Sequence, residues 1–498
     1  MPRWFTRWRV ACPIGALAAD AFVHAPLARW AQTRAHVVAL DDGHQSLTFA
    51  QLHHAVQQQA AELTLHCAPA TVLVDDRLGI VAQMVSFLAI ISSGRCAAVS
   101  DPDWPPAVRQ SVQDTFSTDP TTVPEPTPSS PFYIGFTSGS TGMPKGFRRH
   151  HQSWTESLQI CLDTFGPDAA SCVLSPGRFS HSLFLFGMML GLWSGAGAVV
   201  QDRFSAARMM DTLRSGRTPC LVAVPSQLLL MLELAARRSL EPIKGVRLIL
   251  ISGARWMRDR TAALQALFPK ARIVEFYGAS ETSFMAWMDA QADAPAHAVG
   301  VPFANVDVEI RHPEPSQGIG QIFVRSPMVF MDYVGAATDH TAAVREGDWL
   351  SVRDMGYVDA QGYLCLVGRE SRMVVTQGKN LFPEEVEAVL LAMPDVAQAS
   401  VVGVPDPLRG QQVVAVLQMQ SLVSPALQTP SQPHLMNAQA LTAACREHLE
   451  RYKIPKRFLV CEQWPFTASG KTDHQALAMR VEQYLRDEKG TPCLHKLL

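Results

Sequence analysis

The sequence predicts an α/β protein with a large N-terminal domain and a smaller α+β unit toward the C-terminal end. The 498 residues are enough for two domains with a large buried core. Apolar strand-like runs alternate with helical patterns through the middle of the chain. Two polar stretches, the Pro-rich residues 119–131 and residues 421–433, read as exposed connections between structured parts.

The individual elements follow from this alternation. In the middle of the chain we expect strands at 220–225, 246–252 and 273–276, with helices at 226–237 and 258–267. Near the C-terminal end we expect strands at 373–376, 399–404 and 413–419, with helices at 383–391 and 437–451. The first of these last two helices begins with Pro383, a residue favoured at the first helical position. The pattern therefore predicts a layered α/β part followed by a small α+β unit.

Composition excludes some classes of partner. Hydrophobic residues make up 47% of the chain, charged residues 18%, and the formal net charge is −2, so there is no basic excess for nucleic acid. The ten cysteines include no Cys-x-x-Cys pair, which argues against a zinc ribbon or a secreted disulfide framework. Residues 1–20 make a poor signal peptide. We therefore expect reduced thiols and a cytoplasmic protein.

Residues 183–200 carry no charge and could be mistaken for a membrane span. The stretch contains several glycines, and residues 193–197 look like a helix end followed by a turn. The sequence predicts a Gly-rich core helix followed by a strand, and no transmembrane segment.

Residues 136–146 combine glycines, hydroxyl side chains and Lys145 directly after the apolar run 132–135. Glycines let backbone N–H groups turn toward an anion, hydroxyls add donors, and a lysine supplies positive charge. The order is not that of a Walker loop, because Lys145 precedes Gly146. A flexible linker is the alternative, but a linker has no need of the lysine. The predicted phosphate-binding residues are Thr137, Ser138, Gly139, Ser140, Thr141, Gly142 and Lys145.

Residues 136–146 resemble the signature loop of the adenylate-forming (AMP-binding) superfamily, which includes acyl-CoA synthetases and the adenylation domains of peptide synthetases. Further segments resemble the family's motifs in the family's order: residues 277–281, 354–363, 368–369, 377–387 and 465–471. The resemblance implies a large adenylate-forming domain at 1–368, a hinge at 369–371, a mobile C-terminal domain at 372–480 and a tail at 481–498.

The resemblance also implies ATP and Mg²⁺ as cofactors and assigns roles to single residues. These are Tyr277, Gly278 and Ser280 at the adenine, Glu281 at the metal, Asp354 at the ribose, Arg369 at the nucleotide, Gly253 and Ala254 as backbone contacts, and Lys471 in catalysis. A lysine bridging carboxylate and α-phosphate suits a reaction that depends on electrostatic stabilisation. Other interpretations stay open: a surface-turn aspartate for Asp354, a helix-start glutamate for Glu281, and a simple ion pair for Arg369.

In such enzymes the segment after the phosphate loop lines the substrate site, and here residues 181–189 are apolar. Ser182 stands about where amino-acid-activating relatives carry the aspartate that pairs with the substrate ammonium. An α-amino acid is therefore disfavoured, since a buried ammonium without a partner is costly. A fatty or aryl carboxylic acid fits better, with His181 beside it as a catalytic candidate. Helix core is the alternative for these side chains.

The implied reaction forms an acyl-adenylate and pyrophosphate, and then a thioester on CoA or on the phosphopantetheine of an acyl carrier protein. No cysteine stands in a recognisable nucleophile setting, so an acyl-enzyme is not expected. Three departures from the family pattern, Val352, Arg353 and Ser371, keep a rival hypothesis open, namely a non-catalytic nucleotide-binding scaffold. A stand-alone amino-acid adenylation enzyme is the other alternative.

Overall fold

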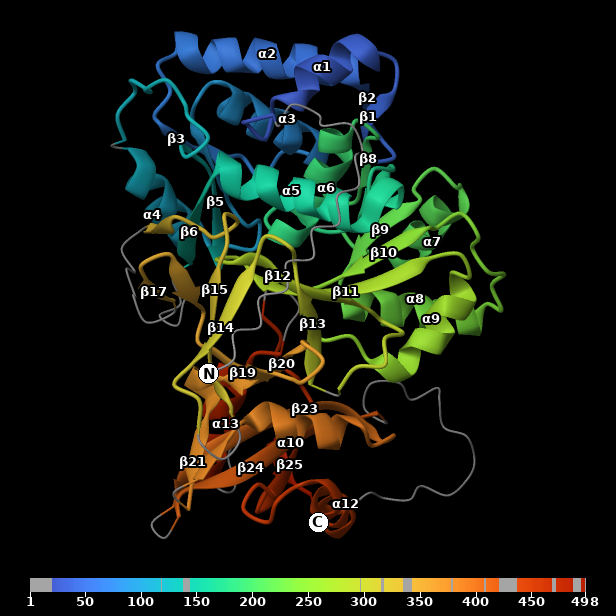
Figure 1. Ribbon diagram of the computed structural model, residues 1–498, viewed down its shortest axis with the longest axis vertical. Helices are drawn as coiled ribbons and strands as arrows, with labels where there is room; N and C mark the ends of the chain where they lie inside the picture. Colours follow the sequence, from blue (N-terminus) through green and yellow to red (C-terminus); the bar gives the residue numbers. More distant parts are fainter. Residues whose placement is uncertain are drawn as a thin grey trace.

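The computed structural model describes residues 20–117, 119–137, 144–295, 297–314, 318–334, 343–377, 379–406, 409–420, 437–467, 472–486 and 494–497. The segments coloured blue to yellow form a large upper body, and most of the orange and red segments form a smaller unit below it (Figure 1). The predicted α/β fold with a small C-terminal α+β unit is confirmed.

A five-stranded sheet carries the strands on either side of the predicted phosphate loop. Its spatial order is β16 (Asp332–Val334), β6 (Lys145–His150), β5 (Pro131–Thr137), β4 (Cys96–Val99) and β3 (Thr71–Val74). The strands β3, β4 and β5 run parallel, with the buried helix α3 (Ile80–Ser92) between β3 and β4 in the chain. The strands β5 and β6 are antiparallel, so that Thr137 lies opposite Lys145.

The expected α/β alternation is confirmed in a second, larger sheet. Its parallel strands are, in spatial order, β8 (Ala198–Val200), β7 (Val173–Ser175), β9 (Cys220–Ala223), β10 (Leu248–Ile251) and β11 (Arg272–Ala279). The helices are α6 (Ser182–Ser194), α7 (Ala206–Arg214), α8 (Pro225–Arg237) and α9 (Thr261–Leu267). Every residue of β9 and β10 is buried, as in parallel strands covered on both faces. The strand β11 runs past its expected end at residue 276, because an antiparallel strand pairs with that end.

Beyond β11 the same sheet becomes antiparallel. The next strands are β12 (Ser283–Asp289), β13 (Ala298–Pro302), β20 (Leu364–Arg369), β19 (Asp354–Val358), β15 (Gly320–Arg325), β18 (Trp349–Ser351) and β17 (Val344–Glu346), with β14 (Asp307–Arg311) beside β15. The chain leaves this sheet at the end of β20 through the short 3-10 helix η3 (Glu370–Arg372). Thus β20 is the last strand before the small unit.

The small unit is built on a six-stranded sheet. Its strands are β22 (Lys379–Leu381), β21 (Val374–Thr376), β24 (Gly410–Met419), β25 (Arg457–Cys461) and β26 (Leu494–Lys496), with β23 (Val396–Asp406) also paired to β24. Its helices are α10 (Pro383–Leu391), α12 (Ala438–His448) and α13 (His474–Arg486). Alternate residues of β23 face opposite sides: Val401 packs in a core with α10 and α12, and Val402 in a core with α13. The expected strands and helices of this unit are confirmed.

The uncharged stretch 183–200 forms a core helix and a strand, as expected. All residues of α6 from Leu183 to Trp193 are buried. The helix ends at Gly195, which has a left-handed backbone with φ +73°, and β8 follows. Of the helices that the structure describes, none is long and apolar enough to cross a membrane.

The remaining elements complete the large body. They are α1 (Pro26–Thr33), β1 (Val38–Asp41), β2 (Ser46–Thr48), α2 (Phe49–Leu65), α4 (Pro106–Ser117) and α5 (His151–Phe165). The helices α1 and α2 cover the upper end of the large body (Figure 1). The helix α2 begins with a capping box between Thr48 and Gln51, which satisfies backbone groups at its first turn.

His151, the first residue of α5, is buried in an aromatic cluster. It is 1% exposed, and its Nδ1 accepts a hydrogen bond of 3.2 Å from the Val23 amide. The Phe132 ring stacks on it, and the His24 ring lies 5.6 Å away. Burial lowers the pKa of His151 to about 3 and that of His24 to about 4. Both imidazoles are therefore neutral at neutral pH.

We expect the free energy of unfolding to fall between pH about 7 and about 5, with up to about 2 kcal/mol of the loss due to His151. The unfolded chain binds a proton near pKa 6.5 that folded His151 does not bind. This stabilisation is present above that pKa and is lost as the pH falls toward the folded value. Urea unfolding at several pH values measures it. His151→Gln keeps an acceptor for Val23 but cannot titrate, so its pH dependence should be weaker.

The control is His54→Gln, on an exposed position of α2, which should leave the pH dependence unchanged. Equal pH dependence of the wild-type protein and the His151→Gln variant would contradict the interpretation.

Candidate active site

Lys145, the lysine of the predicted phosphate loop, lies in a partly buried cluster with Tyr333 and Glu281. Lys145 begins β6 and is 6% exposed. Its ammonium group lies 3.6 Å from the centre of the Tyr333 ring, within the range of cation–π attraction. The Tyr333 hydroxyl donates a hydrogen bond of 2.8 Å to Glu281 Oε1. The structure therefore brings the predicted phosphate lysine and the predicted metal-binding acid to one tyrosine.

Glu281 lies in the tight turn between β11 and β12, so its interpretation as a helix-start glutamate is wrong. The Thr282 hydroxyl accepts a hydrogen bond of 3.0 Å from the Ala279 amide and closes this turn. Among the residues that the structure describes, no three His, Cys, Asp or Glu side chains form a metal cluster. Mg²⁺ commonly binds one or two carboxylates together with phosphates and water. Glu281 is a single carboxylate in one cluster with Lys145, the lysine predicted to bind phosphate. This arrangement fits that pattern.

Gly278 stands where two strands approach closely. The ladder between β11 and β12 shifts its register between Tyr277 and Gly278. A Cβ atom on Gly278 would lie 1.9 Å from the Ser283 carbonyl oxygen, so only glycine fits without moving the backbone. The adjacent Ser280 presents its carbonyl oxygen to Arg149 Nη1 at 2.7 Å. The backbone of the predicted adenine motif is thus held at Gly278 by its close approach to β12 and at Ser280 by Arg149.

Asp354 joins two predicted nucleotide residues in one network. It is 3% exposed on β19, so its interpretation as a surface-turn aspartate is wrong. Its Oδ2 accepts a hydrogen bond from the Tyr277 hydroxyl, and its Oδ1 accepts one of 2.9 Å from Arg369 Nε. Burial and the Asp354 carboxylate raise the pKa of the Tyr277 phenol well above its usual value. Asp354 also raises the pKa of Arg369, with a smaller contribution from Glu281.

Arg369 forms an ion pair with Asp354, the interpretation that stood as the alternative to its predicted contact with the nucleotide, and its side chain is 58% exposed. Arg353, one of the departures from the family pattern, has a left-handed backbone with φ +62°. Its guanidinium donates a hydrogen bond of 2.8 Å to Glu370. The charge that Arg353 adds is therefore paired with Glu370, beside the network of Asp354.

Gly253 and Ala254 follow β10, and Gly253 has a φ of +90°, which suits glycine. His181 stands at the N-terminal cap of α6, with its ring 5.2 Å from that of Phe184. Ser182 is the first residue of α6. Gly253 and Ala254 thus lie after β10, and His181 and Ser182 lie at the start of α6; their roles remain predictions.

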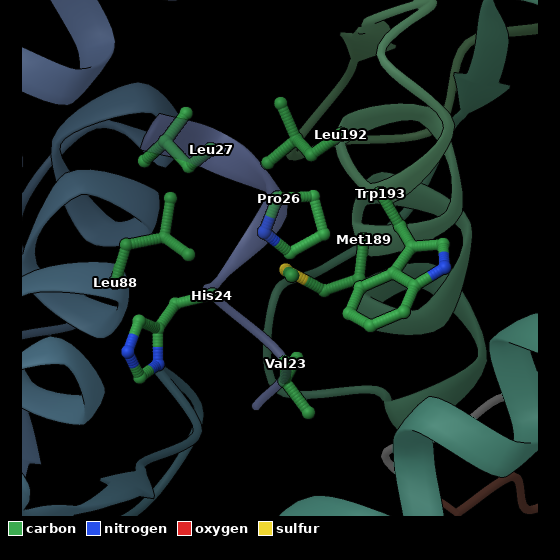
Figure 2. A pocket seen from close by; sticks show the side chains of 8 residues that line it. All are labelled: Val23, His24, Pro26, Leu27, Leu88, Met189, Leu192 and Trp193. Atoms are coloured by element: carbon green, nitrogen blue, oxygen red, sulfur yellow. The ribbon is translucent and has the colours of Figure 1, made fainter. Parts of the chain in front are cut away.

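A small cavity lies near the C-terminal end of α6 (Figure 2). The residues that line it are Val23, His24, Pro26, Leu27, Leu88, Met189, Leu192 and Trp193. Of the predicted acyl-pocket stretch 181–189, only Met189 reaches it. The cavity is therefore not the predicted substrate pocket, and most of that stretch is packed as helix core.

Some predicted site residues lie outside the described part of the chain. These are Ser138, Gly139, Ser140, Thr141, Gly142 and Lys471. Their flanks are described: Thr137 ends β5 opposite Lys145, and Thr472 forms an isolated bridge with Phe466. Their predicted roles remain predictions.

Two residues of the cluster were not predicted from the sequence. Tyr333 contacts both Lys145 and Glu281, and Arg149 binds the backbone beside Glu281. Tyr333 stands far from any Gly-rich loop or acidic motif, so no local pattern marks it. The paired arginines 148–149 directly after the phosphate loop were the one available signal for Arg149.

Comparison with known proteins places these residues in a family. The chain matches the model of the AMP-binding enzyme over residues 105–334 and that of the AMP-binding enzyme C-terminal domain over residues 385–471. It is 38% identical over 366 residues to an uncharacterized acyl-CoA ligase, YhfT, of Bacillus subtilis, covering 72% of this chain and 70% of that protein. It is 30% identical over 376 residues to a 2-succinylbenzoate–CoA ligase of Arabidopsis thaliana, covering 70% and 67%.

Solved structures confirm the fold. O-succinylbenzoate coenzyme A synthetase from Bacillus subtilis, in complex with ATP and a magnesium ion, superposes with a TM-score of 0.76 at 23% identity, over 91% of this chain and 98% of that one. An anthranilate CoA ligase in complex with anthranoyl-AMP superposes with a TM-score of 0.76 at 19% identity, over 94% and 98%. These relatives are all named as CoA ligases or synthetases, the class of enzyme that the sequence predicts. The chain belongs to the AMP-binding enzyme family.

Proposed function

We propose that this enzyme activates a carboxylic acid with ATP and transfers the acyl group to the thiol of CoA. A carboxylate oxygen attacks the α-phosphorus of ATP and pyrophosphate leaves; the CoA thiolate then attacks the acyl carbonyl and AMP leaves. The observation that supports this most is the meeting of Lys145, Glu281 and the Asp354 network, which come from separate segments of the chain. The CoA ligases among the relatives support the same reaction.

The described residues suit distinct parts of MgATP. Lys145 and the loop that it closes neutralise the outer phosphates, and Glu281 offers a hard oxygen to Mg²⁺. Asp354 binds the ribose. Each of its oxygens already accepts one hydrogen bond, and a carboxylate has about four lone-pair sites, so acceptor sites remain for the ribose hydroxyls. Arg369 faces the nucleotide with the exposed part of its guanidinium. When bound, Mg²⁺ supplies positive charge beside the phosphates.

Lys471 is the residue to which we assign the first chemical step. A cation between the substrate carboxylate and the α-phosphate holds the two in line and offsets the charge that accumulates as they react. The assignment rests on the resemblance of residues 465–471 to the last motif of the family, which the C-terminal family match includes.

The substrate is an apolar acid, fatty or aryl. Residues 181–189 are apolar except His181 and Ser182, and no aspartate stands in this stretch to pair with a substrate ammonium. Asp101, which accepts a hydrogen bond of 2.9 Å from Ser180 before the helix, is paired with Arg178. The named acids of the relatives, 2-succinylbenzoate and anthranilate, are aryl acids. Both observations disfavour an α-amino acid.

CoA is the acceptor that we favour, since the relatives carry it in their names. A carrier protein presents the same phosphopantetheine thiol, so product analysis must separate the two. Eight cysteines of the described residues are free thiols, which suits a reducing compartment, and we place the reaction in the cytoplasm.

Lys471→Ala is expected to abolish ATP–pyrophosphate exchange, because the first step loses its bridging cation. Thioester formation from supplied acyl-adenylate should survive, because that step breaks a different bond. Exchange is measured with labelled pyrophosphate over fatty, aryl and amino acids, and products on CoA or holo-carrier protein by mass. Lys270→Ala, at an exposed lysine after α9, is the control and should leave both steps intact. Equal loss of both steps in Lys471→Ala would contradict its role, and absence of exchange with every acid would favour a non-catalytic scaffold.

Asp354→Asn is expected to raise the KM for ATP by about tenfold or more, since hydrogen bonds to a charged partner contribute about 1.5–3 kcal/mol. The amide cannot offset the charge of Arg369 and offers only one acceptor oxygen. The exchange assay at varied ATP measures the effect. The matched control is Asp307→Asn, which breaks an exposed ion pair with Arg325 and should change little. An unchanged KM for ATP in Asp354→Asn would exclude the ribose role.

A further inference from the structure

Arg149 lies where three chain segments of the proposed nucleotide site meet. It stands on β6 after Lys145 and is 2% exposed. Its Nη1 donates a hydrogen bond of 2.7 Å to the Ser280 carbonyl, and its Nη2 donates one of 2.5 Å to the Met328 carbonyl. Its Nε donates to the Ser153 hydroxyl at 3.2 Å. The planar guanidinium thus binds both backbone segments at once.

The charge of Arg149 is buried without a bonded acid. Burial lowers the pKa of Arg149 to about 10, so the group remains a cation at neutral pH. Within the described ranges, no carboxylate forms an ion pair with it, and its hydrogen bonds go to two carbonyls and a hydroxyl. An apolar side chain could fill this space without the cost of burying a charge. Packing alone therefore does not account for an arginine here.

The two carbonyls belong to the segments that carry the other members of the cluster. Ser280 directly precedes Glu281, and Met328 begins the stretch that leads to Tyr333 in β16. The Phe330 amide donates a hydrogen bond of 2.7 Å to the Glu281 carbonyl, so the two segments are also joined to each other. The stretch with Tyr333 is also held on β6 by the pairing of β16, whereas Arg149 ties the Ser280 segment to β6.

We propose that Arg149 is a positioning residue for MgATP, which sets the place of Glu281 relative to Lys145 and to Tyr333 on the neighbouring strand. The proposal rests on the proposed function, in which Glu281 binds the metal and Lys145 the phosphates. Without the guanidinium, the Ser280 and Met328 carbonyls lose buried hydrogen bonds, and their segments shift to recover partners. The effect on the nucleotide is indirect and passes through the backbone.

The chain offers a matched control in Arg148, the neighbouring residue on the same strand. Successive side chains of a strand face opposite sides, and Arg148 forms an ion pair with Asp332 at the surface. We expect Arg149→Met to weaken MgATP binding, measured by calorimetry without the acid, by about tenfold or more. The KM for MgATP in the exchange assay should rise similarly, with a smaller change in the KM for the acid. Arg148→Met should bind MgATP within about twofold of the wild type.

Arg149→Lys keeps the charge but lacks the planar guanidinium, so this variant should bind MgATP with intermediate affinity. If Arg149→Met does not fold, the affinity of Arg149→Lys decides the question. Wild-type affinity for MgATP in either folded variant would overturn the proposal. So would equal losses for MgATP and the acid, which would mark a general structural role. Because binding is measured without turnover, absence of exchange in the wild-type enzyme would overturn the proposed function and leave the test of Arg149 decisive.

Discussion

The hydrogen bond between Tyr277 and Asp354 is the constraint on which the proposed nucleotide site depends. Tyr277 lies on β11 and Asp354 on β19, and three strands, β12, β13 and β20, separate them in the sheet. In a flat sheet, four strand spacings would place β11 and β19 about 19 Å apart, farther than the two side chains together can reach. The antiparallel half of the sheet must therefore curl back over the end of β11. That curl brings the predicted adenine motif and the predicted ribose motif together. It buries the Asp354 carboxylate, which the Tyr277 and Arg369 donors stabilise.

The same curvature explains why the phosphate residues meet this network. The loop that leaves β11 carries Glu281, and Glu281 contributes to the raised pKa of Arg369 on the far side of the curl. On its other side Glu281 is bound by Tyr333, which belongs to the five-stranded sheet of Lys145. A turn of the larger sheet and a strand of the five-stranded sheet thus meet at Glu281. A displacement of either sheet would change the distance between the residues proposed for the outer phosphates and those proposed for the ribose.

Local patterns predicted those parts of the site that local chemistry dictates. The alternation of strands and helices, the end of α6 at Gly195 and the start of α10 at Pro383 are encoded within a few residues, and the structure confirms them. The contact of Asp354 with Tyr277 was not predictable, because Tyr277 is 77 residues away and reaches it through the curl of the sheet. Tyr333 and Arg149 were missed because their partners also lie far away along the chain. The interpretation of Glu281 as a helix-start residue also failed. Glu281 lies in a strand-to-strand turn, because β12 pairs with the end of β11.

Ion pairs also support the hinge predicted at residues 369–371. Arg369 is bound to Asp354 of the large body, whereas Arg372 is bound to Glu384 and Glu387 in the small unit. Glu387 in turn accepts a hydrogen bond of 2.7 Å from the Val401 amide, which fixes Arg372 to the sheet of that unit. The chain therefore passes from one rigid network to the other within three residues. The pair between Arg353 and Glu370 spans this step and is partly exposed. Asn380 also donates a hydrogen bond of 2.6 Å to Glu314 of the large body, and Phe382 packs with Ile319 and Val367. Rotation here would break these contacts and leave the ion pairs of Arg369 and Arg372 intact.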